Sequence, residues 1–133
     1  MKSISFFSFV FLFVFFACKD SGVSPCEFKS GTYNYISYDT LGIMATTGSL
    51  ILSRSDSKIS GTWNFNDGRS GNLVGKIDKD SIELYLYPGG VDHYLTLMGK
   101  FSNNIYTGKW ILYGWGIRGK GTFKAQYQMR MAP

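Results

Sequence analysis

The only histidine of the chain, His93, limits the chemistry that the sequence can perform. A metal site built from several histidines is excluded. A Ser-His-Asp triad would need His93 as its base, and Asp92 stands next to it. Adjacent residues on a strand point to opposite faces, however, and no nucleophile-elbow motif is present. The sequence therefore predicts no catalytic residue and no metal site.

The acidic residues also argue against an enzyme. A glycosidase needs two carboxyl groups that face each other across the bound sugar. Asp78 and Asp80 instead fall in a short polar segment, where aspartates are typical turn residues. No glycine-rich loop follows a strand and opens a helix, so nucleotide binding lacks its motif. We expect neither an enzymatic activity nor a cofactor.

Aromatic and cationic side chains are better candidates for a binding site. Trp115 stands between two glycines, and we expect it either to contact a ligand or partner or to fold over the end of the domain. Tryptophans on expected strands are candidates for the core as well as for ligand contact. Cations in expected loops could steer a polar head group or simply keep the loops soluble. The candidate ligand-binding residues are Trp63, Trp110, Trp115, Arg69, His93 and Arg118.

Three hairpins of similar length must position these residues. Each consists of two runs in which apolar and polar residues alternate, joined by a short polar turn. The hairpins span residues 48–65, 71–87 and 93–113, with turns at 55–57, 78–80 and 102–104. One more strand precedes them at 31–39 and another follows at 120–129, which predicts eight strands.

The strand pattern favours a closed barrel over a sandwich. Each strand has one apolar and one polar face, as expected for a sheet with one buried side. Glycines within strands mark bends, and closing a sheet into a barrel needs such bends. Closure also removes the two exposed edges of an open sheet. We therefore predict an all-β fold, an eight-stranded antiparallel up-and-down β-barrel over residues 31–130, with bends at Gly61, Gly75, Gly108 and Gly121.

This barrel resembles the calycin group, which includes lipocalins, fatty-acid-binding proteins and avidins. The resemblance covers residues 31–130 and rests on the eight meander strands and on recurring G-x-[WY] starts, namely Gly31-Thr32-Tyr33, Gly61-Thr62-Trp63 and Gly108-Lys109-Trp110. A lipocalin would carry G-x-W at the first of these. Avidins hold biotin with a buried Asp in the last strand, which residues 119–125 lack, so biotin binding is not implied. The resemblance implies a small barrel whose mouth binds an apolar or amphipathic molecule.

The loops of a meander alternate between the two ends of the barrel. The three tight turns share one end, and longer loops at 40–47, 66–70, 88–92 and 114–118 share the other. We take the long-loop end as the mouth, because binding groups usually lie on longer loops over a rigid scaffold. The first strand begins at the tight-turn end, so we expect the N-terminal segment and any lipid on it to leave there, with the mouth facing away from the membrane.

Residues 1–17 are typical of an export signal. Lys2 precedes an apolar run that is too short to span a bilayer, and Ala17 stands just before Cys18. This resembles a bacterial lipoprotein signal, which implies that Cys18 receives lipid and that residues 18–30 form a flexible tether. Cys26 is then left alone and no disulfide can form, whereas a plain secretory signal would leave a Cys18–Cys26 bridge possible. We expect a lipid-anchored protein of the cell envelope, at the outer membrane.

Two functions from different classes remain open. The first is a non-enzymatic barrel that binds a small apolar or amphipathic molecule. The second is a protein-binding module with a filled barrel, such as an envelope inhibitor of lysozymes or proteases. A cavity of roughly 300 Å³ or more would favour the first. The charge of +5 is scattered, so we expect no nucleic-acid partner, and an edge-free barrel needs no second copy, so we expect a monomer.

Overall fold

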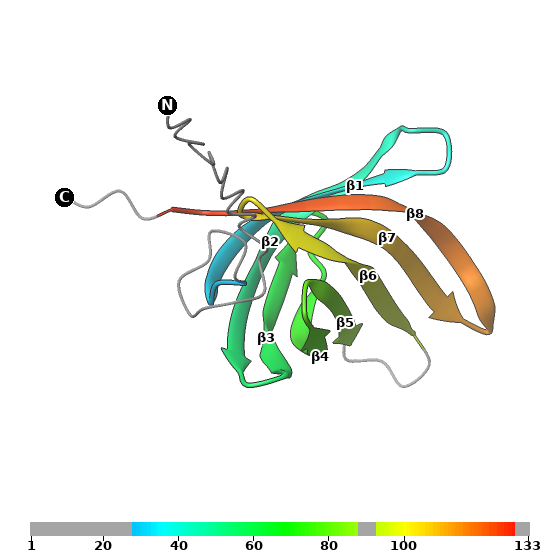
Figure 1. Cartoon of the computed structure of the whole chain (residues 1–133). Helices are drawn as coiled ribbons and strands as arrows, with labels where there is room; N and C mark the ends of the chain where they lie inside the picture. The colour runs from blue at the N-terminus through cyan, green and yellow to red at the C-terminus, as the bar shows by residue number, and fades with distance from the viewer. Residues whose placement is uncertain (1–27, 88–92, 130–133) are drawn as a thin grey trace, which may run out of the picture.

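The computed structural model describes residues 28–87 and 93–129 and consists of eight antiparallel strands (Figure 1). They are β1 (Gly31–Asp39), β2 (Met44–Ser55), β3 (Lys58–Phe65), β4 (Ser70–Asp78), β5 (Ser81–Tyr87), β6 (Tyr94–Ser102), β7 (Ile105–Gly114) and β8 (Gly116–Tyr127). Each strand pairs with the next along the chain, and β1 also pairs with β8, which closes the barrel. The predicted fold class is confirmed. In the described part of the chain, no helix is long and apolar enough to cross a membrane.

The three tight turns connect β2 to β3, β4 to β5 and β6 to β7, as the sequence predicts. Each contains a residue with positive φ: Asp56, Lys79 and the pair Asn103 and Asn104. The asparagine pair, at φ values of 53° and 64°, matches the two-residue turn whose twist suits a β-hairpin. Asparagine enters this region more easily than most residues, so local sequence fixes this turn.

The opposite end differs from the expected loops. The β1–β2 connection is only residues 40–43, because β2 begins at Met44 rather than Gly48. The expected loop at 114–118 is a single residue, Trp115, since β8 begins at Gly116 rather than Lys120. Gly116 has a φ of 92°, which lets the chain reverse here at once. The loop expected at 66–70 is residues 66–69, and the loop expected at 88–92 lies outside the described residues.

The interior of the barrel is filled mostly by aromatic rings and leucines. The rings of Tyr35 and Phe65 stack with centroids 4.8 Å apart, and Tyr106 meets Phe123 edge-on at 4.7 Å. The Tyr106 hydroxyl lies 3.0 Å from each of two carbonyl oxygens, to which it can donate its hydrogen bond. These rings fill the middle of the barrel, where eight strands leave room for packed side chains or one small ligand.

The four glycines that the sequence marks as bends lie close against the backbone of neighbouring strands. A Cβ atom at Gly121 would lie 1.9 Å from the carbonyl oxygen of Tyr38 on the neighbouring strand. Clashes of 1.8 to 2.2 Å with neighbouring carbonyl oxygens would occur at the other three, Gly61, Gly75 and Gly108. Because no real Cβ fits at these distances, glycine lets adjacent strands approach closely enough to close a narrow barrel.

Phe28, which the sequence places in the expected tether, closes the tight-turn end from inside. It is buried, its ring stacks on Tyr33 at 5.7 Å, and it meets Phe101 edge-on at 5.4 Å. The Tyr33 hydroxyl donates to the carbonyl of Lys29 at 2.6 Å, and this bond holds the segment in place. The packed domain therefore begins before Gly31. The cause is tertiary, since one apolar ring can cover the open end of a barrel.

Both ends of the described domain lie at the tight-turn end. Gly31 pairs with Leu52 near the β2–β3 turn, and Tyr33 pairs with Tyr127 at the end of β8. The Lys29 ammonium group lies 5.5 Å from the centroid of the Tyr127 ring. The described chain thus begins at the end opposite the mouth. The expected signal segment, Cys18 and Cys26 lie outside the described residues.

Candidate functional site

A small apolar cavity opens at the mouth of the barrel. Its volume is about 90 Å³. Pockets that hold drug-sized ligands have roughly 300–1,000 Å³, so this one has room for a few waters or a very small molecule. It is lined by Tyr35, Ser37, Ala45, Thr46, Phe65, Arg69, Leu95, Trp110 and Leu112. This cavity has no space for a lipocalin-sized ligand.

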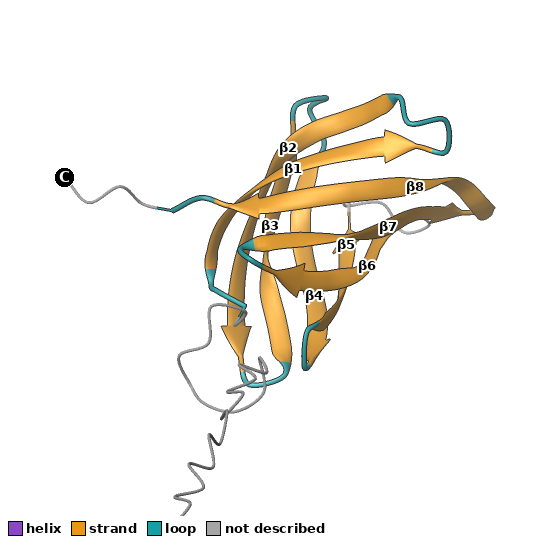
Figure 2. Cartoon of the chain, turned by 45° about the horizontal axis from the view of Figure 1, so that its top comes forward, coloured by secondary structure: helices purple, strands orange, loops and turns teal. Residues whose placement is uncertain are grey.

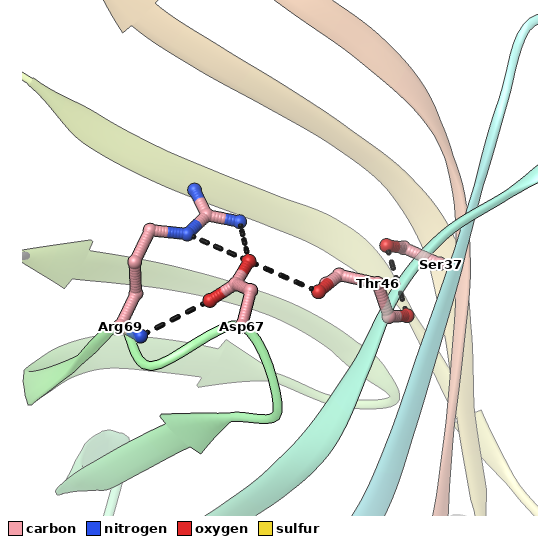
Figure 3. Close-up of polar contacts among 4 residues, drawn as sticks. All are labelled: Ser37, Thr46, Asp67 and Arg69. Atoms are coloured by element: carbon pink, nitrogen blue, oxygen red, sulfur yellow. Dashed lines mark hydrogen bonds and ion pairs between the residues drawn. The ribbon is translucent and has the colours of Figure 1, made fainter.

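A chain of polar contacts runs along one side of this mouth (Figure 3). Asp67 accepts hydrogen bonds from the Arg69 guanidinium at 2.7 and 2.9 Å, and from the Arg69 backbone N–H at 3.0 Å. The Thr46 hydroxyl donates to the same carboxylate at 3.2 Å. These donors, Arg69 first, lower the pKa of Asp67. Arg69 is therefore neutralised within its own loop.

Two residues of β1 make the polar floor of the cavity. Burial raises the pKa of Tyr35 to about 12, against smaller lowering effects of Ser37 and Arg69. Ser37 is buried, and its hydroxyl lies 3.4 Å from the Thr46 carbonyl oxygen, which makes a weak bond at best. Neither residue was among the sequence candidates. The period-two alternation of β1 carried the signal, because Tyr33, Tyr35 and Ser37 share its buried face.

The candidate tryptophans lie in three different environments. Trp63 is buried in the core, where its indole N–H donates to the carbonyl of Asn72 at 3.1 Å. Trp110 is half-buried, lines the mouth cavity, and donates to the carbonyl of Tyr38 at 2.8 Å. Trp115 is 83% exposed at the tip of the β7–β8 hairpin and does not cover the barrel end.

A second exposed tip lies on the neighbouring hairpin. Figures 1 and 2 show the β1–β2 and β7–β8 hairpins reaching beyond the other strands. At the β1–β2 tip, Leu41 is 82% exposed, and the nearby Ile43 and Met44 are exposed as well. The Asp39 carboxylate accepts hydrogen bonds from the backbone N–H groups of Leu41 and Ile43 at 2.8 and 2.9 Å, which shapes this turn. We call Leu41, Ile43, Met44, Trp115 and Ile117 the apolar tips.

The candidate cations separate into two groups. His93 and Arg118 are exposed and lie together beside Gly114, since a Cβ there would stand 3.0 Å from both side chains. Arg69 lies on the cavity rim with Trp110. The six sequence candidates therefore form no single site. Arg69 and Trp110 share the cavity. The three candidates near the β7–β8 tip are Trp115, His93 and Arg118, and Trp63 belongs to the core.

Tyrosines form a row on the outer face, just behind the β7–β8 tip. Tyr94 pairs with Tyr113 across β6 and β7, with ring centroids 4.9 Å apart, and Tyr87 lies 6.4 Å from Tyr94. Tyr113 pairs in turn with Ile117 of β8. This row gives the mouth end an aromatic belt on the outside of the barrel.

The outer face also carries two open hollows nearer the tight-turn end, of about 560 and 650 Å³. They are broad and solvent-exposed. Their charged groups are those of exposed lysines, of Asp78, and of Glu83, which pairs with Lys76 at 3.5 Å. No buried polar side chain points into them within the described residues. We therefore do not assign a site there.

Nothing in the described residues resembles a catalytic or metal centre. Between residues 28 and 87, and between 93 and 129, no three His, Cys, Asp or Glu side chains lie close enough to hold a metal ion. The perturbed pKa values belong to Asp67, bound to its own loop, and to four tyrosines. These groups have structural causes and do not converge on one point.

The geometry defines a class: a closed, eight-stranded antiparallel barrel with a filled interior, a shallow mouth cavity and two exposed hairpin tips. No protein-family model matches the sequence, and no curated protein shows significant similarity to it.

Proposed function

We propose that this protein is a non-enzymatic binding module that acts through the surface of its mouth end. The observation that carries the proposal is a contrast in volume and exposure. The mouth cavity lined by described residues has a volume of about 90 Å³, whereas Trp115 at the tip beside it is 83% exposed. A large exposed apolar residue without a packing role is a typical contact residue.

The proposal favours the second of the two functions considered from the sequence. A filled barrel is what a module that works through its surface requires. The polar groups of the mouth cavity support it further, because Arg69, the basic residue that lines the cavity, is already paired with Asp67. An inhibitor of an envelope lysozyme or protease is one form that such a module would take.

The proposal also includes the location of the protein in the cell. The apolar run before Ala17 and the Cys18 that follows support export and lipidation at Cys18, hence a lipid-anchored protein of the cell envelope. The strand order supports membership of the calycin group. Absence of strand edges supports a monomer.

A small amphipathic ligand is the second candidate, because the mouth cavity itself is apolar. Tyr35, Phe65 and Trp110 line it, and the Arg69 guanidinium lies 5.5 Å from the Phe65 ring centroid. At about 90 Å³ it would admit only the end of such a molecule.

Native mass spectrometry distinguishes the two candidates. The chain from Ser21 to Pro133 contains every strand and every buried core residue that the structure describes. It should be produced by export and never denatured. A clean apo mass is the expected result. A reproducible extra mass, released as a small molecule and lost in a Ser37→Leu variant that fills the cavity, would overturn the proposal.

A further inference from the structure

We infer that the mouth end, which lies opposite the end where an anchor at Cys18 would attach, docks on a second, anionic lipid surface, with the apolar tips inserted at the level of the head groups. The inference rests on the proposed function and names the partner of the same surface. Three independent features of the described residues carry it: the apolar tips, the tyrosine row behind them and the distribution of charge.

The first feature is the pair of apolar tips. Trp115 and Leu41 are more than four-fifths exposed, while Ile117, Ile43 and Met44 are 64%, 61% and 59% exposed. The two hairpins are neighbours, because β1 pairs with β8 as far as Asp39 and Gly121. Both project from the same end of the barrel (Figure 2). Two separate apolar tips at one end suit a fluid lipid surface, because each tip can insert between lipids without a preformed pocket.

The second feature is the order of residue types away from the β7–β8 tip. Trp115 comes first, Tyr113 and Ile117 form the next pair, and Lys120 pairs with Ile111 behind them. At about 3.3 Å per residue, Arg118 lies roughly 10 Å behind Trp115 along the strand. Surface-bound apolar residues reach roughly 5–10 Å into the boundary between head groups and chains. The tyrosines and the basic residues then lie at the level of the membrane–water interface, where these residue types are common in membrane proteins.

The third feature is charge complementarity. Residues 28–87 carry six basic and six acidic residues and are neutral overall. Residues 93–129 carry five basic and no acidic residues, namely Lys100, Lys109, Arg118, Lys120 and Lys124. The two aspartates described near the mouth are occupied, Asp39 by backbone N–H groups and Asp67 by Arg69. The strands behind the Trp115 tip therefore present an acid-free basic face to an anionic partner.

Vesicle binding tests the inference directly. The Ser21–Pro133 chain lacks the expected lipid, so any binding comes from the folded domain. It should sediment with vesicles of phosphatidylcholine containing about 30% phosphatidylglycerol and far less with pure phosphatidylcholine. Binding should weaken as salt is raised. The emission of Trp115 should shift to shorter wavelength on binding, and a Trp115→Phe variant should bind without that shift.

Matched variants separate the tips and charges from the rest of the surface. Trp115→Ala and Leu41→Ala should each weaken vesicle binding, the first about tenfold or more. Ile51→Ala, which removes an exposed apolar side chain from the outer face of β2, should leave it unchanged. The double variant Arg118→Gln, Lys120→Gln should lose about fivefold per charge. Lys58→Gln, Lys100→Gln removes two charges near the other end and should lose little.

Two outcomes would overturn the inference. The first is no sedimentation with the anionic vesicles. The second is binding that falls equally in the tip variants and in their controls, because a general electrostatic attraction would then explain it. If vesicles do not bind but a photo-crosslinker at position 115 captures a discrete protein in the native envelope, the lipid partner is wrong and the proposed surface function stands. A small molecule found by native mass spectrometry would instead overturn the proposed function.

Discussion

The Trp110 indole N–H donates a hydrogen bond to the carbonyl oxygen of Tyr38 at 2.8 Å, between residues 72 positions apart. Trp110 lies on β7 and Tyr38 on β1, two strands that do not pair with each other. The strand between them is β8, and Gly121 stands at the crossing, where an added Cβ would lie 2.6 Å from the indole nitrogen. The bond thus reaches across β8 and helps to hold the barrel closed beside its mouth.

Gly121→Ala should destabilise the protein by about 2–4 kcal/mol, because the new methyl group displaces both partners and breaks this bond. Chemical denaturation followed by tryptophan fluorescence measures the loss. Gly114→Ala is the control, since its Cβ would meet only the movable side chains of Arg118 and His93. Equal stability of the two variants would show that the Trp110–Tyr38 bond does not matter for closure.

Phe28→Ala should cost about 2–4 kcal/mol, within the range for removing a large apolar side chain from a core. The ring is buried against Tyr33 and Phe101, so its loss would open the tight-turn end to water. The shift in denaturation midpoint measures the effect. Phe28→Leu should recover most of the stability, whereas a wild-type midpoint for Phe28→Ala would mean that the barrel ends at Gly31.

Stability should fall as the pH rises from about 10 to 12. Tyr35 keeps its proton to about pH 12 in the folded barrel, whereas an unfolded tyrosine loses it near about 10. In that window the unfolded state binds fewer protons than the folded state, so unfolding becomes more favourable. Burial raises the pKa of Tyr33 and Tyr106 as well, which adds to the fall.

Denaturation midpoints measured across this alkaline range test the prediction. A Tyr35→Phe variant should lose part of the decline, because it has no proton to release at that position. All other groups are the same in the variant and the wild type, so the difference between the two curves isolates Tyr35. Parallel curves for the two proteins would contradict the burial of its hydroxyl.

Trp63→Ala and Trp115→Ala should separate stability from binding. Trp63 is 3% exposed and its replacement should cost about 3–5 kcal/mol. Trp115 is 83% exposed and its replacement should change the free energy of unfolding by about 0.5 kcal/mol or less. Thermal denaturation of both variants gives the comparison. Unfolding of the Trp115 variant would assign that residue to the core and end its role as a contact.

Local sequence determined the strands and the tight turns. Alternation of apolar and polar residues sets which face of a strand is buried, and this needs no knowledge of its partners. Asn103 and Asn104 favour the backbone of their turn by themselves, and inward glycines such as Gly121 marked the bends that closure requires. The closed barrel followed, because eight such strands have no other way to lose both edges.

The candidate site was harder to predict from the sequence, because alternation indicates which way a side chain points but not how much space remains around it. The size of the mouth cavity depends on how Tyr35, Phe65 and Trp110 pack from three separate strands. The position of Trp115 depends on strand pairing between β7 and β8 that continues to Gly114 and Gly116. Because of this pairing, Trp115 lies at the tip of a hairpin instead of in the expected loop. Burial of Phe28 likewise needs the rings that receive it. Sequence by itself determined the barrel and its two ends, and only tertiary packing decided that the barrel is filled and that its apolar surface lies outside.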